Sequence, residues 1–201
     1  MKILGIIGGM SPESTATYYT EINRLVNQKK GGNISAPIVM VSVEFEEIVQ
    51  CQKQSEWQRA GEILAEAGKK LEMIGAEGIV LATNTMHKVA PQIERALSIP
   101  FLHILDATAD AIKSRGLNKV ALLGTKFTMS DNFYRDGLIV RGITPIVPNE
   151  SAQNEIHRII FDELCVGKFL PQSKAFYLDT IEFLRKQGAE AVSYTHLTLP
   201  T

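Results

Sequence analysis

Residues 75–91 read GAEGIVLATNTMHKVAP. The run from Gly78 to Ala82 has the length and the aliphatic content of a buried strand. The polar triplet Thr83-Asn84-Thr85 follows it directly, and a helical pattern then extends from His87 to Leu97. A strand, a polar turn and a helix form the unit of α/β proteins, which bind ligands beyond the carboxyl ends of their strands. The triplet can cap the helix, or it can bind an anion such as a carboxylate.

The composition is that of an ordinary soluble globular protein. The chain has 201 residues, of which 45% are hydrophobic and 21% charged, and its net charge is −1. This charge gives no basis for nucleic-acid binding, and no apolar run is long enough to span a membrane. The two cysteines, Cys51 and Cys165, have neither metal-ligand spacing nor a disulfide framework. We therefore expect a cytoplasmic protein without a metal.

The amino-terminal segment has a similar organisation. Residues 2–7 predict a buried strand, and Gly8-Gly9-Met10 predict the loop that leaves it. Ser11, Pro12 and Glu13 are residue types typical of a helix N-cap and first turn. The loop contains neither G-x-G-x-x-G nor G-x-x-x-x-G-K, so the sequence disfavours nucleotide binding.

Two landmarks of the first half recur in the second half. The segment KVALLGT at 119–125 has the character of KILGIIGG at 2–9, and GAEAV at 188–192 echoes GAEGI at 75–79. Because their order and approximate spacing agree, we predict an internal duplication. The predicted fold is α/β, with two similar doubly wound lobes and a cleft between them.

The first predicted lobe spans residues 1–116 and the second spans residues 117–192. By the repeat, the second lobe requires more strand residues, a polar turn and a helix after Val192. The chain continues instead with SYTHLTLPT at 193–201. We interpret this segment as a foreign tail on an incomplete second lobe, with a natural short terminus as the alternative.

Four motifs together resemble the aspartate/glutamate racemase family, and within it the branch of broad-specificity amino acid racemases. They are GGMSPEST at 8–15, ATNTMHKVAP at 82–91, LLGTKFTM at 122–129 and FDELCVG at 161–167. The resemblance extends from Met1 to about Val192. It implies two doubly wound α/β lobes with the active site between them, and racemisation of an acidic or related amino acid without pyridoxal phosphate or a metal. It also implies a homodimer.

The resemblance implies two catalytic cysteines, one from each lobe. One thiolate would remove the proton from Cα, and the other thiol would return a proton from the opposite face. The first cysteine position corresponds to Ala82, and the repeat places the second at Thr195 or His196. None of these residues is a cysteine, and alanine has no ionisable group. We therefore expect this chain to be catalytically impaired.

The resemblance further implies seven substrate-binding residues: Gly9, Met10, Gln52, Thr83, Asn84, Thr85 and Thr125. Asn84 and Thr85 would bind the α-carboxylate, and Gln52 would reach towards the substrate side chain. The alternatives are helix capping for Asn84 and Thr85, loop packing for Gly9 and Met10, and simple surface exposure for Gln52. Some relatives carry a lysine near the position of Cys165, so the cysteine puts a preference for aspartate in doubt.

Two other functions stay open on the sequence alone. One is a non-catalytic amino-acid-binding relative that keeps the cleft without the thiols. The other is a different enzyme of the superfamily, such as an isomerase or decarboxylase acting on a small carboxylic acid.

Overall fold

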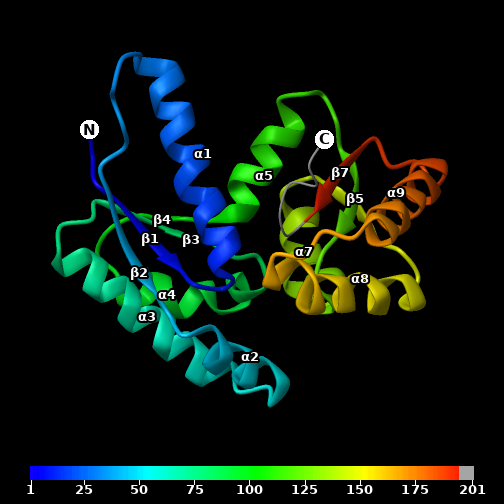
Figure 1. Cartoon of the computed structure of the whole chain (residues 1–201), viewed down its shortest axis with the longest axis horizontal. Helices are drawn as coiled ribbons and strands as arrows, with labels where there is room; N and C mark the ends of the chain where they lie inside the picture. Colours follow the sequence, from blue (N-terminus) through cyan, green and yellow to red (C-terminus); the bar gives the residue numbers. More distant parts are fainter. Residues whose placement is uncertain (195–201) are drawn as a thin grey trace. The chain divides into compact units, whose positions relative to one another are not determined.

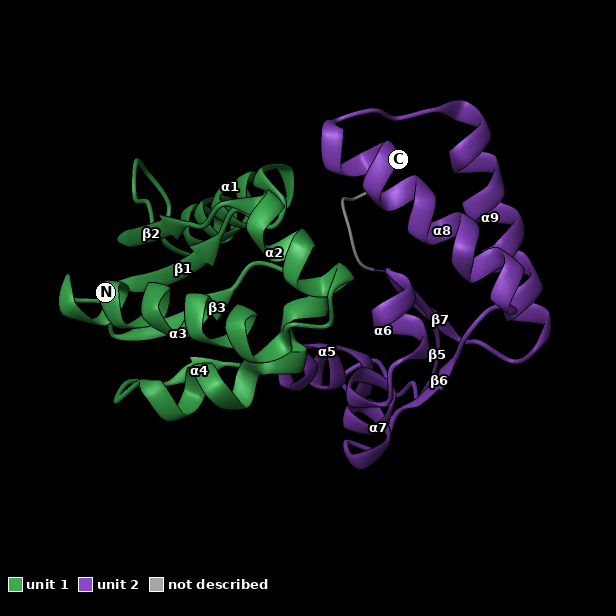
Figure 2. Cartoon of the chain, turned by 90° about the horizontal axis from the view of Figure 1, so that it is seen from below, with its two compact units in different colours: residues 1–103 green, residues 104–201 purple. Residues whose placement is uncertain are grey.

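The computed structural model describes residues 1–194. They form two compact units, the first from Met1 to His103 and the second beginning at Ile104 (Figures 1 and 2). The paired strands of both units are parallel, and helices connect them, so the predicted α/β class is confirmed. Thr195, His196 and the rest of the tail to Thr201 lie outside the described residues. No helix of the described part is long and apolar enough to cross a membrane.

The first unit is built on a four-stranded sheet in the order β2-β1-β3-β4. Its strands are β1 (Leu4–Gly8), β2 (Ile38–Ser42), β3 (Gly78–Leu81) and β4 (Phe101–Leu102). Its helices are α1 (Pro12–Lys30), α2 (Phe45–Lys53), α3 (Trp57–Met73), the 3₁₀ helix η1 (Thr85–Val89) and α4 (Ala90–Ala96). Helix α1 lies on one side of the sheet, and α3 and α4 lie on the other (Figure 1). The central strands are therefore covered on both faces, which explains their continuous aliphatic sequences.

Helix boundaries in this unit follow local sequence signals. Helix α1 begins as predicted, with Pro12 at its first position and the Ser11 hydroxyl accepting a hydrogen bond from the Ser14 N–H at 3.4 Å. Helix α3 is amphipathic and buries Leu64 and Leu71 on its apolar face. The helix ends at Met73, and Ile74, which follows it, is 58% exposed.

The second unit contains a three-stranded sheet in the order β6-β5-β7. Its strands are β5 (Lys119–Leu123), β6 (Thr144–Ile146) and β7 (Ala191–Tyr194). Its helices are α5 (Ile104–Lys113), α6 (Lys126–Ser130), α7 (Asn132–Val140), α8 (Glu150–Asp162), η2 (Leu164–Val166) and α9 (Pro171–Lys186). This order corresponds to the β2-β1-β3 part of the first sheet, and the internal duplication stays a prediction.

The boundary between the two compact units differs from the predicted lobe boundary at residue 116. Helix α5 belongs to the second unit because its Leu105 and Ile112 are buried in the core around β5. At the other end of the unit, β7 includes Ser193 and Tyr194, which the sequence assigns to the tail. They pair with Leu122 and Leu123 of β5.

The repeated Gly-Ala-Glu triplet has the same geometry in both units. Its glycines end α3 and α9 with positive φ angles, +97° at Gly75 and +99° at Gly188. Its glutamates each accept a hydrogen bond at the start of the central strand. The Ile3 N–H donates to Glu77 Oε1 at 3.0 Å, and the Lys119 N–H donates to Glu190 Oε2 at 2.9 Å. The triplet therefore turns the chain from a helix into a strand and attaches that strand to the sheet.

Replacement of Gly75 by alanine is expected to lower the free energy of unfolding of the first unit by about 1 kcal/mol. The cost is conformational, since an added Cβ would meet only Ile3 Cδ1, at 4.0 Å. Gly78→Ala is the matched control, because Gly78 lacks a positive φ and its Cβ would lie 3.7 Å from the Pro100 carbonyl. Urea unfolding followed by the fluorescence of Trp57, the one tryptophan of the chain, compares the variants. Equal losses of stability would contradict the prediction.

Candidate active site

The carboxyl ends of β1 and β3 bring two predicted binding segments together in the first unit. These neighbouring parallel strands pair Ile7 with Leu81, and the Ala82 N–H donates to the Ile7 carbonyl at 2.9 Å. Beyond the strands, the Ser14 hydroxyl donates to the Ala82 carbonyl at 3.2 Å. The glycine loop at 8–11 and the polar turn at 83–85 therefore leave the same edge of the sheet.

The glycine loop passes very close to the segment that follows β2. Gly9 has a φ of +94°, and an added Cβ would lie 2.4 Å from the carbonyl oxygen of Val43. The Gly9 N–H donates to Thr15 Oγ1 at 2.8 Å, which fixes the loop on the first turn of α1. Met10, the next residue, is fully buried. Any residue with a Cβ would therefore be strained at position 9 of this loop.

The polar turn differs from the helix start that the sequence predicts. Residues 85–89 form the five-residue 3₁₀ helix η1, and α4 begins only at Ala90. Asn84 occupies the N-cap position but makes no side-chain capping hydrogen bond, so the capping alternative is wrong for this residue. Thr83 and Thr85 are buried, and Asn84 is half-buried. The turn thus holds three polar side chains next to the glycine loop.

Gln52 lies on α2 and contacts the segment that follows the turn. Its side chain is only 6% exposed, so the alternative of a solvated surface glutamine is wrong. Its Nε2 donates to the Met86 sulfur at 3.1 Å. A thioether is a weak acceptor, so this amide is held near the turn without a strong partner for that N–H. The neighbouring Cys51 is buried, and burial raises the pKa of its thiol.

His87 is a buried polar residue that the sequence does not single out as a binding residue. Its side chain is 3% exposed, and its Nδ1 lies 2.7 Å from the Thr83 carbonyl oxygen. Burial, together with the neighbouring His103, lowers the pKa of His87 to about 3. The four-residue spacing from Thr83 is the only sequence signal for this contact, and many helical residues share it.

Thr125 belongs to the second unit, where it follows β5. It is buried at the N-cap of α6, and its hydroxyl accepts a hydrogen bond from the Thr128 N–H at 3.3 Å. Thr125 therefore caps α6, and its role towards a substrate stays a prediction. In the described part of the chain, no group of three or more His, Cys, Asp or Glu residues could hold a metal ion.

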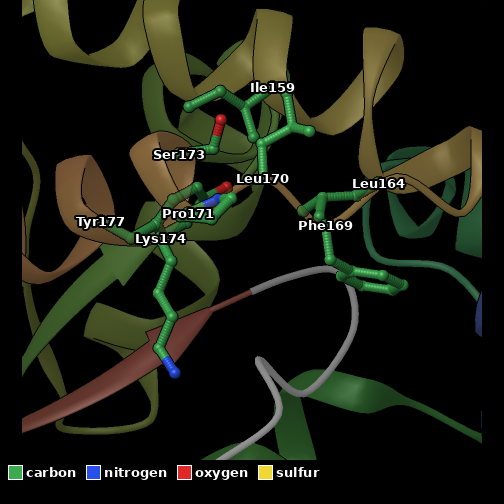
Figure 3. Close-up of a pocket in the computed structure, with 8 residues that line it drawn as sticks. All are labelled: Ile159, Leu164, Phe169, Leu170, Pro171, Ser173, Lys174 and Tyr177. Atoms are coloured by element: carbon green, nitrogen blue, oxygen red, sulfur yellow. The ribbon is translucent and has the colours of Figure 1, made fainter.

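The second unit also contains a small apolar pocket between α8, η2 and the start of α9 (Figure 3). Its volume is about 200 Å³. Its lining residues are Ile159, Leu164, Phe169, Leu170, Pro171, Ser173, Lys174 and Tyr177. The Tyr177 hydroxyl is buried and has no hydrogen-bond partner among the described residues. Burial and the nearby Glu163 carboxylate raise the pKa of this phenol.

We expect Tyr177→Phe to leave the stability of the chain unchanged or to raise it by about 1 kcal/mol, because the variant removes a buried hydroxyl without a partner. Ser173→Ala is the matched comparison in the same pocket wall, since the Ser173 hydroxyl donates to the buried Glu163 carboxylate. That variant should lose about 1–3 kcal/mol. Urea unfolding followed by far-ultraviolet circular dichroism measures both changes. A loss with Tyr177→Phe as large as that with Ser173→Ala would contradict the prediction.

Comparison with known proteins identifies the protein family of this chain. Residues 7–193 match the family model for Asp/Glu/Hydantoin racemases. The chain belongs to this racemase family. The resemblance carried by the four sequence motifs is thereby confirmed.

Two solved structures and one curated sequence are similar to this chain over most of its length. The crystal structure of a candidate Asp/Glu racemase from Yersinia pestis has a TM-score of 0.88 and 47% sequence identity, covering 96% of this chain and 85% of that chain. An aspartate racemase homologue from Pyrococcus horikoshii OT3 has a TM-score of 0.81 and 38% identity, covering 96% of this chain and 84% of that chain. The broad specificity amino-acid racemase RacX of Bacillus subtilis (strain 168) is 25% identical over 160 residues, which are 79% of this chain and 69% of RacX.

Proposed function

We propose that this member of the racemase family binds an amino acid at the polar turn of its first unit, and that its family reaction is inversion at Cα without pyridoxal phosphate or a metal. The observation that carries the proposal is the joining of two loops at one sheet edge. The glycine loop and the turn at 83–85 leave adjacent strands, and the Ser14–Ala82 hydrogen bond joins the start of α1, which follows the loop, to the residue before the turn. Parallel sheets bind ligands at this edge.

The α-carboxylate would be bound by individual donors in the turn. Asn84 supplies a side-chain amide, and Thr83 and Thr85 supply hydroxyl groups. The turn is followed by a 3₁₀ helix of five residues, not by a long α-helix, so a helix dipole contributes little. Recognition of the carboxylate therefore depends on how each donor of the turn is aimed.

The substrate side chain would meet Gln52. A neutral amide can donate to a carboxylate and can also pair with a hydroxyl or another amide, so this residue suits a range of polar side chains. Its present acceptor, the Met86 sulfur at 3.1 Å, is weak, and exchange for a carboxylate oxygen is favourable. The proposed substrate class is therefore an amino acid with an acidic or related polar side chain.

Proton transfer in this chain is proposed to be impaired. A two-base reaction needs an ionisable group on each face of Cα, and Ala82 offers none. The two cysteines of the sequence lie away from position 82, Cys51 on α2 and Cys165 in η2. Cys51 is the nearer to the turn along the chain, but burial raises the pKa of its thiol, which disfavours the thiolate base.

Proton exchange at Cα tests the proposal. The L- and D-forms of glutamate, aspartate and homoserine are incubated with the protein in D₂O, and loss of the α-proton signal is followed by NMR. We expect no exchange with the chain as it stands, although saturation-transfer NMR should detect amino acid binding. Ala82→Cys should introduce exchange with one enantiomer, because a single thiolate reaches one face of Cα.

Thr83→Cys is the matched variant one residue further on. Ala82 and Thr83 are both buried. The chain bends between β3 and the turn, where the Thr83 N–H donates to the Leu81 carbonyl at 2.9 Å, so the two side chains start from different places on the bend. Exchange with Thr83→Cys alone would move the reactive position to residue 83. Exchange with the unmodified chain would overturn the impairment. Binding without exchange in every variant would favour the non-catalytic amino-acid-binding alternative, and the absence of both would overturn the proposed function.

A further inference from the structure

We infer that His87 is a positioning residue, which sets the direction of the peptide group between Thr83 and Asn84. Its Nδ1 lies 2.7 Å from the Thr83 carbonyl oxygen. A carbonyl oxygen can only accept, so Nδ1 carries the hydrogen and donates it. The consequence for ligand binding rests on the proposed function, whereas the hydrogen bond and the tautomer do not.

The surroundings of His87 keep the imidazole neutral and in place. The ring packs edge-on against His103, with centroids 4.7 Å apart, and lies tilted against Phe101, with centroids 5.7 Å apart. The side chain is almost completely buried, and the lowered pKa agrees with the neutral form. A neutral imidazole has one N–H, so the bond to Thr83 requires the Nδ1–H tautomer.

No regular element determines how this peptide group is oriented. Strand β3 ends at Leu81, and η1 begins at Thr85. The peptide between Thr83 and Asn84 therefore lies outside both hydrogen-bond ladders. The side chain of His87 supplies the constraint that the backbone pattern lacks.

The orientation of this peptide decides where the Asn84 N–H points. A trans peptide is planar, so the Thr83 carbonyl and the Asn84 N–H point in opposite directions. Because His87 holds the carbonyl on its own side, the Asn84 N–H is aimed away from His87. The adjacent carbonyls are held as well: that of Ala82 by the Ser14 hydroxyl at 3.2 Å, and that of Asn84 by the His87 N–H at 3.0 Å.

Three consecutive carbonyl oxygens of the turn are thus engaged by groups of the protein. A carboxylate is repelled by carbonyl oxygens and needs N–H or O–H donors. Because the protein holds these carbonyls in place, the N–H and O–H donors of residues 83–85 face the ligand before it binds. His87 contributes to binding through the peptide group and does not touch the substrate itself.

Two substitutions of similar polarity separate this role from simple filling of space. The amide nitrogen of asparagine reaches about as far as Nδ1, whereas that of glutamine is one bond further out, towards the place of Nε2. His87→Asn can therefore keep the bond to the Thr83 carbonyl, and His87→Gln cannot keep it without moving. Lys88→Gln is the control on the same helix. The Lys88 ammonium lies over the Trp57 ring, 4.3 Å from its centroid, and this contact does not involve the peptide groups of the turn.

The experiment has two readouts on the full chain. Long-range ¹⁵N–¹H NMR of the imidazole should show the Nδ1–H tautomer of His87 at neutral pH. Titration with L-glutamate should give a dissociation constant that His87→Gln raises by about tenfold or more, while His87→Asn and Lys88→Gln stay within about threefold of the unmodified chain. The amide resonance of Asn84 should move in His87→Gln and stay near its position in the other two variants.

An Nε2–H tautomer would overturn the inference. So would an unmoved Asn84 resonance in His87→Gln with unchanged affinity. If no form of the chain binds an amino acid, the proposed function fails, and the tautomer and the Asn84 resonance still decide the role of His87.

Discussion

Gly9→Ala should lower the free energy of unfolding of the first unit by roughly 2–4 kcal/mol. The first cause is conformational, because Gly9 has a φ of +94°. The second is steric, because the new Cβ would lie 2.4 Å from the Val43 carbonyl oxygen and 2.8 Å from the Ser42 hydroxyl oxygen. The hydroxyl can rotate away, but the carbonyl cannot. Val43 is itself fixed to the loop through its N–H, which donates to the Gly8 carbonyl at 3.0 Å.

Gly31→Ala separates the two causes. Gly31 also has a positive φ, +77°, but an added Cβ there meets nothing within 4 Å. That variant should lose only the conformational part, about 1–3 kcal/mol, since a φ of +77° with a ψ of 178° lies in a region essentially restricted to glycine. The difference between the two variants is the steric cost of the close approach at Gly9. Urea unfolding followed by Trp57 fluorescence measures both in the same unit, and similar losses would show that the loop adapts without strain.

Gly9→Ala also tests the proposed function. If the loop has to move away from Val43, the alignment of the glycine loop with the polar turn changes at the sheet edge. Affinity for L-glutamate should then fall by about tenfold or more, whereas Gly31→Ala, at the end of α1, should bind as the unmodified chain does. Loss of stability without loss of affinity in Gly9→Ala would place the ligand away from this loop.

Local signals account for much of the fold of the first unit. Ser11, Pro12 and Glu13 predict the start of α1 because capping depends on neighbouring residues only. The aliphatic run after Gly78 predicts β3 because a strand buried on both faces needs no alternation. The repeated Gly-Ala-Glu triplet indicates two similar helix-to-strand turns, and the structure shows the same contacts in each.

The polar turn was less accessible to prediction because its conformation depends on tertiary contacts. Periodicity from His87 onwards predicts one α-helix, whereas the structure has η1 and then α4. The Thr83 carbonyl is bound by the side chain of His87, and Gln52 reaches the same segment from α2. A sequence pattern contains neither the packing of α2 beside η1 nor the burial of Gln52. The proposed roles of Ala82 and Thr125 rest on the family resemblance and stay predictions.

The first unit of the unmodified protein is expected to lose stability as the pH falls, because His87 is buried and neutral. His87→Asn should abolish this part of the loss. The pKa of His87 falls from its ordinary 6.5 to about 3 in the folded protein, chiefly through burial and then through His103. Between these two values the unfolded chain binds a proton that the folded chain does not. Stability of the unmodified protein is therefore unaffected by this group above pH 6.5 and falls as the pH decreases towards 3. Asparagine does not titrate, so the variant lacks this contribution.

The expected size of the effect follows from the separation of the two pKa values. At pH 5 the unfolded imidazole is almost fully protonated and the folded one is neutral, which lowers the stability of the unmodified chain by about 2 kcal/mol relative to pH 7. The difference in free energy of unfolding between the unmodified chain and His87→Asn should shift by this amount. Urea unfolding at both pH values, followed by Trp57 fluorescence, gives that difference for the first unit.

His157→Asn is the control, since His157 lies in the second unit and should leave the pH dependence seen by Trp57 unchanged. Parallel pH profiles for the unmodified chain and His87→Asn would mean that His87 titrates alike in both states, and the buried neutral imidazole would then be excluded. A shift of the expected sign would mean that the folded protein keeps the His87 imidazole neutral down to about pH 5. The orientation of the turn, and with it amino acid binding, would then not depend on protonation of His87 at any pH above about 5.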